Sequence, residues 1–411
     1  MIRLTLAELQ DELSSERNLL LVQDVDGVCM PLVRDPLERR LDPGYIEAAA
    51  SLEDSFRVLT NGEHAGRRGL NRLVEAALTG ERDAAAEGLY LPGLAAGGVQ
   101  LQDSRGNLSH PGVSEAELDF LGALPERLLE RLESGLRPLL PEASARERHR
   151  LILQAVLDNP VSPTINLNGL FAWVGPDPGR RQTLQRLALE LMAEHLIEAR
   201  TSGLDGSFFL HLAPNLGRER GQERLMPAGH AQGGTTDVQF MLRGARKEVG
   251  LLVLLNQHIA ARCGKAPLGE DFNARQAPER EADLLRICRE RISEDQMPTL
   301  VGVADTITSE PLTDGRGWSR GGSDRGFLQL VQGLGECFGR PNRVVLVDSS
   351  TGELDRPSLG DPQLKGLSDP EDPLHIDALV PGGPAEYVKW FQQLAGRRRA
   401  LAKADSRPGF V

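Results

Sequence analysis

The stretch Leu19-Leu20-Leu21-Val22-Gln23-Asp24-Val25-Asp26-Gly27-Val28 decides the fold. Its apolar half has the length and composition of a buried strand in a parallel sheet. Asp24 then stands at the carboxyl end of this strand, where open α/β sheets bind their ligands. Gly27 allows the backbone to turn sharply out of the strand. The sequence therefore predicts a ligand site at this strand end.

Two carboxylates lie within three residues here, on Asp24 and Asp26. They repel each other and lose water at a buried strand end, and a bound divalent cation offsets that cost most directly. The structural alternative is that one Asp merely caps the following turn. The rest of the chain favours the cation.

Composition limits the class of protein and its partners. The chain has 411 residues, of which 40% are hydrophobic and 26% charged, as in a soluble globular protein with two or three domains. A net charge of -12 argues against nucleic acid or an anionic membrane as a partner. No apolar run is long enough to cross a bilayer, and the N-terminus is not that of a signal peptide. We expect a cytoplasmic protein with reduced, mostly buried cysteines.

Two further strands end in polar residues. An apolar strand from Ser55 runs into Thr60-Asn61-Gly62, whose uncharged donors suit a phosphate group. The alternative is a capped turn into a helix that starts near Ala65. A strand that starts near Pro298 ends at Asp305, which is well placed to hold Mg²⁺ together with Asp24.

Two helix starts are also informative. Lys247 lies in the first turn of a predicted helix, where the helix dipole disfavours a cation unless an anion lies close by. A lysine that reaches out to solvent is the alternative. The glycine-rich loop 318–326 precedes another helix and either closes over a substrate or anion, or is a plain helix start capped by Ser323 or Asp324.

The chain divides into a core and an insertion. Residues 112–232 hold two long helical segments, with a break or kink expected at Pro125, and short strands at 164–168 and 208–212. We predict that they form an α+β lid within a core made of residues 1–111 and 233–411. Residues 355–373 are rich in Pro, Gly and Asp and are expected to be a long surface excursion.

The order D-x-D-G, strand-Thr, helix-start Lys and strand-Asp resembles the haloacid dehalogenase (HAD) superfamily of phosphatases. The fold this implies is α/β, with a Rossmann-like core, a parallel sheet flanked by helices, and an inserted α+β cap of the C2 type. The stretches 23–30, 234–241 and 320–325 further resemble a family of cyanobacterial salt-tolerance phosphatases that act on glucosylglycerol 3-phosphate. That resemblance covers almost the whole chain.

The resemblance implies a role for each matching residue. Asp24 is the expected nucleophile, which forms an aspartyl-phosphate, and Asp26 the general acid and base. Thr60 and Lys247 are expected to hold the phosphoryl oxygens. Mg²⁺ is expected on Asp24, Asp305 and the backbone carbonyl of Asp26. The further phosphate- or substrate-binding residues are Gly27, Asn61, Arg320, Ser323 and Asp324.

One departure concerns the metal site. The last motif of the superfamily has a second acid a few residues after the first, and here Glu310, Asp314 or neither takes that place. The implied partner is a small sugar phosphate, with functional coupling to the synthase that makes the phosphorylated glycoside.

Other functions stay open at this point. Sucrose 6-phosphate, trehalose 6-phosphate and mannosylphosphoglycerate are alternative substrates, because no residue of the predicted cap identifies the sugar. A metal-dependent glycosyltransferase also uses D-x-D, but it gives Lys247 and Asp305 no role. A sugar-phosphate-binding protein without activity is a third alternative.

Overall fold

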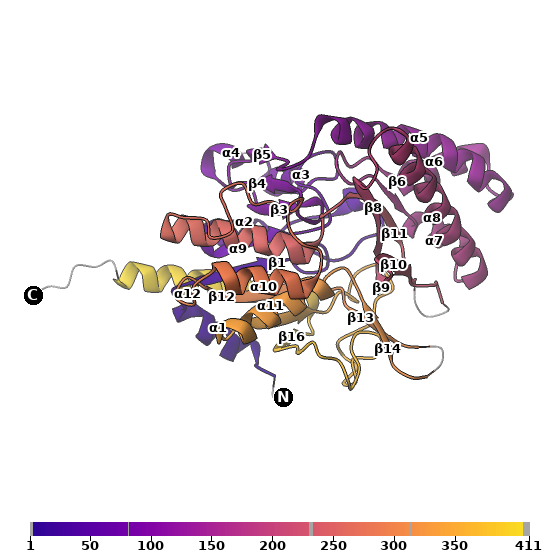
Figure 1. The fold of residues 1–411 in the computed structure, drawn as a ribbon. Helices are drawn as coiled ribbons and strands as arrows, with labels where there is room; N and C mark the ends of the chain where they lie inside the picture. The colour runs from indigo at the N-terminus through magenta and orange to yellow at the C-terminus, as the bar shows by residue number, and fades with distance from the viewer. Residues whose placement is uncertain (1–2, 81, 230–232, 313–314, 406–411) are drawn as a thin grey trace, which may run out of the picture.

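The computed structural model describes residues 3–80, 82–229, 233–312 and 315–405. Its largest sheet has the order β16-β15-β12-β1-β2-β3-β4-β5. The strands from β16 to β3 are parallel, whereas β4 and β5 are antiparallel to their neighbours. The predicted α/β class with a mostly parallel sheet is confirmed (Figure 1). The strands are β1 (Leu19–Gln23), β2 (Phe56–Leu59), β3 (Gly93–Ala95), β4 (Gln100–Gln102), β5 (Leu108–Ser109), β12 (Thr299–Ala304), β15 (Arg343–Val347) and β16 (Ala378–Val380).

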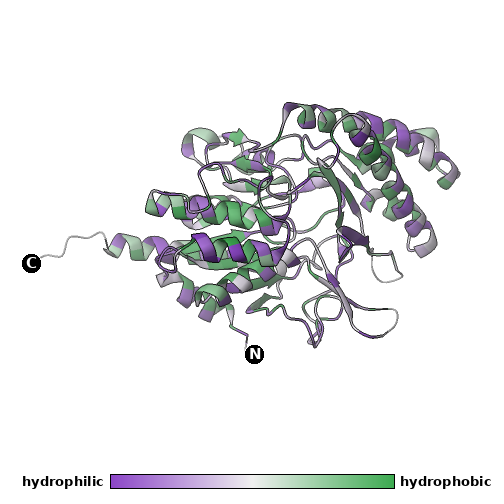
Figure 2. Ribbon diagram, in the orientation of Figure 1, coloured by the Kyte–Doolittle hydropathy of each residue, from purple (hydrophilic) through white to green (hydrophobic). Residues whose placement is uncertain are grey.

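Helices cover both faces of this sheet. All five residues of β1 are buried, which explains its continuous apolar run. Leu19 and Leu21 pack in one hydrophobic cluster and Leu20 and Val22 in another, because side chains alternate along a strand. The first cluster includes residues of α1 (Leu6–Ser15), α2 (Pro43–Ser51), α3 (Leu70–Ala77), α4 (Ala84–Glu87) and α12 (Gly383–Asp405). The second includes residues of α9 (Lys247–Cys263), α10 (Glu281–Arg291) and α11 (Arg325–Phe338). These helices carry hydrophobic and hydrophilic residues side by side, as expected of amphipathic helices (Figure 2).

Gln23 is the one polar residue in β1, and both polar atoms of its buried side-chain amide have a hydrogen-bond partner. Its Nε2 donates to the carbonyl of Asp24 at 3.0 Å, and its Oε1 accepts from the hydroxyl of Tyr387 at 2.6 Å. The C-terminal helix α12 therefore braces the strand end that carries Asp24.

A second sheet is inserted between β5 and α9. It has the order β6-β7-β11-β8, is antiparallel throughout, and packs against four helices at the upper right of Figure 1. Its strands are β6 (Val156–Leu157), β7 (Thr164–Asn166), β8 (Phe208–Ala213) and β11 (Asp237–Leu242), and the helices are α5 (Glu115–Leu139), α6 (Ala145–Ala155), α7 (Asn168–Val174) and α8 (Pro178–Thr201). A hairpin of β9 (Asn215–Glu219) and β10 (Gln222–Leu225) accompanies it. We call this inserted unit, residues 115–242, the cap.

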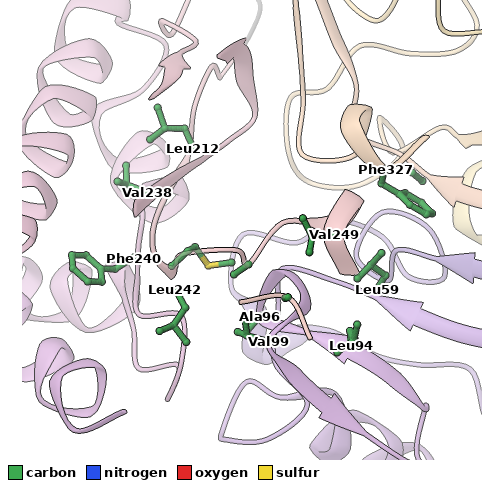
Figure 3. Packing of buried hydrophobic residues seen from close by; sticks show 14 of the residues in the cluster. Leu59, Leu94, Ala96, Val99, Leu212, Val238, Phe240, Leu242, Val249 and Phe327 are labelled. Atoms are coloured by element: carbon green, nitrogen blue, oxygen red, sulfur yellow. The ribbon is translucent and has the colours of Figure 1, made fainter. Parts of the chain in front are cut away.

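The predicted boundary between cap and core, at residue 233, differs from the boundary that the strand pairing gives. β11 pairs with β7 and β8 of the cap sheet, so that this sheet extends to Leu242. The cap and the core nevertheless share one hydrophobic cluster, in which Phe240 and Leu242 continue into Val99 and Leu59 of the core (Figure 3).

Two local predictions were wrong, and of the break or kink expected at Pro125 the break is absent. The helix expected from Ala65 begins at Leu70, because the amides of Leu70 and Asn71 bond to the carbonyls of Glu63 and His64 across a tight loop. The expected glycine-rich loop contains β14 (Trp318–Gly321), which pairs with β13 (Thr308–Pro311). The helix α5 runs on through Pro125.

Two of the four cysteines, Cys29 and Cys288, are buried, whereas Cys337 is half-buried and Cys263 exposed. Among the residues that the structure describes, no helix combines the length and the apolarity that crossing a membrane requires.

Candidate active site

Three of the predicted residues meet at one edge of the large sheet. β12, β1 and β2 are neighbours, and Asp305, Asp24 and Thr60 follow them directly. The amide of Asp24 still bonds to the carbonyl of Val303 at 2.9 Å, and that of Thr60 to Leu94 at 3.0 Å. The parallel ladder therefore fixes the backbone of these residues, and loops do not have to position them.

Lys247 enters this edge from the first residue of α9. Its Nζ lies 2.6 Å from Oδ2 of Asp24 and 2.5 Å from Oδ1 of Asp324, and its side chain is 1% exposed. The alternative of a solvent-exposed lysine is excluded, and an anion bound between Lys247 and the amides of the helix start stays a prediction. The anions that contact Lys247 in the structure are carboxylates of the chain itself.

Asp324 stands at the start of α11, as predicted, but its side chain contacts Lys247. Its Oδ2 accepts a hydrogen bond from the amide of Thr306 at 2.9 Å, and it makes no side-chain cap on α11. Asp24, Asp305 and Asp324 are all buried, and each offers a carboxylate oxygen within 4.8 Å of the others. We call these three residues the acidic triad.

The acidic triad fits a divalent cation. Oδ2 of Asp305 is buried and has no hydrogen-bond donor among the described residues. A buried carboxylate oxygen without a partner is costly, and hard cations such as Mg²⁺ prefer carboxylate oxygens. The chemistry of the donors and this unpartnered oxygen agree with a metal position.

The pKa values show the same electrostatic conflict. Burial raises the pKa of Asp24 to about 7, although Lys247 opposes the shift. Burial, together with the charges of Asp324 and Asp24, raises the pKa of Asp305 to about 8. Desolvation alone would lower the pKa of Lys247, but the carboxylates of Asp24 and Asp324 raise it above its usual value. A second positive charge between the carboxylates would relieve this conflict.

Gly27 makes room for the acidic triad. Its φ is +79°, and a Cβ built on it would lie 2.3 Å from Oδ2 of Asp305. A side chain here would both strain the backbone and displace the carboxylate. The structure thus gives Gly27 a steric role, whereas a contact with substrate was predicted.

Asp26 is held by an arginine that the sequence analysis did not identify. Nη1 of Arg39 lies 3.1 Å and 2.8 Å from the two carboxylate oxygens of Asp26. The other donors of Arg39 bond to the carbonyls of Pro36 and Arg68, so that the guanidinium is fixed from behind. The side chain of Asp26 stays 30% exposed, which leaves it open to a ligand.

The loop after β2 connects the site to the cap. Oγ1 of Thr60 accepts from the amide of Gly62 at 3.1 Å. The side-chain nitrogen of Asn61 lies 2.9 Å from Nε2 of His211 on β8. The other ring nitrogen of His211 lies 2.9 Å from Glu223 on β10. Asn61 is therefore positioned by cap residues.

The cap presents a polar face above the acidic triad. A cavity of about 160 Å³ is lined by Asp24, Asp26 and Thr60 from the core and by Asn166, Asp237 and Gln239 from the cap. Asn166 and Asp237 are opposite each other on β7 and β11 and share a hydrogen bond of 2.7 Å. Val238, between Asp237 and Gln239, is buried on the other face. This alternation gives the cap sheet one apolar face and one face of hydrogen-bonding groups.

The remaining predicted residues have different positions. Ser323 and Asn61 line the cavity. Arg320 is instead bound by Asp369, with two contacts of 2.7 Å, because β14 places it in the hairpin. Glu310 lies on β13 of the same hairpin, outside the acidic triad. Asp314 lies outside the described residues.

Two cavity residues gave little signal in the sequence. Arg39 and Arg356 both line the cavity, but neither lies in a recognisable sequence motif or next to another residue of the site. Asp324 was visible as an acid near a helix start. Its distance from Asp305 concealed its place in the acidic triad, since the hairpin β13–β14 separates the two.

Comparisons with known proteins show which family the chain resembles. A family model described as glucosylglycerol-phosphate phosphatase matches residues 18–395. The chain is 46% identical over 399 residues to the glucosylglycerol-phosphate phosphatase of Synechocystis sp., covering 94% of both chains. Among solved structures, the C-terminal domain of Candida albicans trehalose-6-phosphate phosphatase aligns with a TM-score of 0.47 and 11% identity, over 96% of this chain and 97% of that one. A trehalose-6-phosphate phosphatase related protein aligns with a TM-score of 0.39 and 11% identity, over 94% and 99%.

Proposed function

The chain belongs to the glucosylglycerol-phosphate phosphatase family, and we propose how its side chains hydrolyse glucosylglycerol 3-phosphate. It is accordingly a phosphoric monoester hydrolase. The observation that carries the mechanism is the buried group of Asp24, Lys247 and Asp324 at the end of β1. Asp24 is the only member of this group that also lines the cavity.

Asp24 acts as the nucleophile. Its Oδ1 accepts from the amide of Val25 at 2.7 Å and its Oδ2 from Lys247 at 2.6 Å, so that the carboxylate is oriented before substrate binds. Attack on phosphorus breaks the bond between phosphorus and the ester oxygen, which leaves with the glycoside, and forms an aspartyl-phosphate. Lys247 and Thr60 stabilise the charge that develops on the phosphoryl oxygens.

Asp26 transfers the protons. It starts protonated and gives this proton to the leaving oxygen of the glycoside. It then takes one from the water that attacks phosphorus, which breaks the bond to Asp24 and restores the Asp24 carboxylate. Arg39 positions its carboxylate through Nη1. The proton balance closes over the two steps, because the proton lost in the first is regained in the second.

Asp24, Asp305 and Asp324 would hold Mg²⁺, together with the backbone carbonyl of Asp26 that the superfamily resemblance implies. When bound, the ion supplies positive charge that lowers the repulsion between the Asp24 carboxylate and the phosphate dianion. Relative to the sequence prediction, Asp324 takes the place of the uncertain second acid.

The cap face supports a glycoside as the leaving group. Asn166, Asp237 and Gln239 supply amide and carboxylate groups of the kind that bind sugar hydroxyls. Oε1 of Gln239 is buried and has no partner among the described residues, which suits a hydroxyl donor. Coupling to a synthase and a cytoplasmic location stay predictions.

An acid-quench experiment tests the nucleophile. Wild-type protein mixed with substrate and quenched in acid should carry one phosphate on Asp24, identified by mass spectrometry of peptides. Asp24→Asn should keep its melting temperature but lose at least about 10³-fold in kcat and carry no phosphate. Asp119→Asn, an exposed carboxylate on α5, is the matched control and should behave as wild type. Substantial turnover by Asp24→Asn would exclude this nucleophile.

A further inference from the structure

One cation in the cavity belongs to a segment that has no role so far. Arg356 lies in the irregular stretch between β15 and β16, which the sequence analysis describes as a surface excursion. The structure corrects that description at this position, because Arg356 lines the same cavity as Asp24 and Thr60. Asp348, directly after β15, fixes the segment by accepting hydrogen bonds from the hydroxyl of Ser358 at 2.8 Å and the amide of Leu359 at 2.9 Å.

The guanidinium of Arg356 is poorly satisfied. Its Nε is buried without a hydrogen-bond partner among the described residues, and its Nη1 makes one long contact of 3.4 Å with the carbonyl of Asp355. Desolvation lowers its pKa although the charges of Asp305 and Asp237 oppose that shift. A desolvated guanidinium in a polar cavity needs an acceptor, because leaving it unpaired is costly.

The other arginines of the cavity already have carboxylate partners. Arg39 is paired with Asp26, and Arg68 with Asp158 on the cap. Within the described part of the chain, Arg356 is the cavity arginine for which no carboxylate lies within ion-pair distance. Its donors are therefore the ones still available to an anionic ligand.

The charge balance of the site asks for such a cation. The acidic triad carries three negative charges, which Lys247 and a divalent ion would neutralise. A phosphate dianion then adds charge that no paired residue offsets. The planar fork of a guanidinium matches the oxygens of a phosphate group.

We propose that Arg356 is a phosphate-binding residue, whose guanidinium donates to the non-bridging oxygens of the substrate phosphate and of the inorganic phosphate released. This inference rests on the proposed function and extends it to a residue outside the superfamily motifs. It also gives the segment after β15 a purpose, which is to deliver one cation to the cavity.

Binding of inorganic phosphate tests this assignment separately from turnover. Isothermal titration calorimetry in a buffer that contains Mg²⁺ should show that the Kd for inorganic phosphate is at least about tenfold higher for Arg356→Gln than for wild type. This is the effect of losing charge-assisted hydrogen bonds. The inhibition constant for phosphate should rise equally. Arg356→Lys, which keeps the charge without the fork, should lie in between. Arg34→Gln removes an exposed arginine that does not line the cavity and should match wild type.

Two substrates separate the alternatives. Under the proposal, kcat/KM of Arg356→Gln falls by a similar factor for glucosylglycerol 3-phosphate and for p-nitrophenyl phosphate, because both carry the phosphate. Loss confined to the glycoside, with phosphate binding unchanged, would overturn the proposal and assign Arg356 to the sugar. If Arg356→Gln does not fold, Arg356→Met should show the same weak phosphate binding, because it removes the buried charge but keeps a long unbranched side chain. A wild-type protein that binds phosphate without hydrolysing either ester would instead contradict the proposed function and leave Arg356 supported.

Discussion

Asp305 concentrates the electrostatic conflict of the site in one side chain. One of its carboxylate oxygens has no donor among the described residues, and its pKa is raised to about 8. Asp24 follows β1, the strand next to the β12 strand that Asp305 follows, and its pKa is raised to about 7. Without metal, the folded protein therefore holds protons that the unfolded chain releases near pH 4 (about 3.9 for a free Asp).

This difference predicts a stability that depends on pH and metal together. Because the unfolded chain binds fewer protons between about pH 4 and pH 8, the metal-free protein should lose stability as the pH rises through that range. Mg²⁺ requires the ionised carboxylates, so its stabilising effect should grow over the same range. We expect the increase in melting temperature on adding Mg²⁺ to be larger at pH 8 than at pH 6.

The control for that measurement is Asp305→Asn. This variant removes the most perturbed carboxylate, and it should show a smaller loss of melting temperature towards pH 8 and little response to Mg²⁺. An equal Mg²⁺ effect at pH 6 and pH 8 in the wild type would contradict the assignment of the acidic triad as the metal site.

The sequence predicts a site residue well when that residue stands at the end of a strand or the start of a helix that the hydrophobic pattern itself predicts. Asp24, Thr60 and Asp305 each come after a buried strand, and Lys247 begins a helix, so their meeting at one sheet edge could be predicted. Arg356 could not be predicted in the same way, because its place depends on how a long irregular segment folds back over the sheet.

At the scale of elements, the loop after β2 is one of the polar links between core and cap. Oε1 of Glu63 accepts three hydrogen bonds of 2.8 Å, from the amides of Val161 and Ser162 and from the hydroxyl of Ser162. Burial raises the pKa of Glu63 to about 7 although these donors oppose the shift. The same loop begins at Thr60, so the position of the cap and that of the residue we propose to hold the phosphate are connected.

Glu63→Ala should disturb both properties. It leaves three buried donors without an acceptor, which should lower the free energy of unfolding by about 3 kcal/mol. We also expect KM to rise, since Thr60 and the cap lose their common anchor. Urea unfolding and steady-state kinetics measure the two effects. The control Glu38→Ala, at an exposed position of the short turn Pro36–Glu38, should leave the free energy of unfolding and KM unchanged. If Glu63→Ala also leaves them unchanged, the loop does not link the cap to Thr60.

Elements with a clear period were predicted, and so were two short strands of the cap, at 164–168 and 208–212. The strands and helices of the core follow apolar runs, and both long cap helices were anticipated. The strand β11 was missed because Asp237 and Gln239 interrupt its apolar residues, yet these are the polar residues that face the cavity. The hairpin β13–β14 was missed because its glycines and arginines favour a loop.

For the whole molecule, the layers explain where chemistry can occur. The carboxyl edge of the large sheet and the polar face of the cap sheet line one cavity, and the hydrophobic cluster in Figure 3 joins the two units. The net charge of -12 means that a phosphate ester must be met by local cations. In the proposed mechanism, Lys247 and Arg356 supply them from two different segments.

The most direct test of the account is phosphate release from glucosylglycerol 3-phosphate, sucrose 6-phosphate, trehalose 6-phosphate and mannosylphosphoglycerate, each with Mg²⁺ and with EDTA. The account predicts release that requires Mg²⁺, with kcat/KM for glucosylglycerol 3-phosphate at least about tenfold above the other three. Equal or faster release from another ester, or turnover that persists in EDTA, would contradict it.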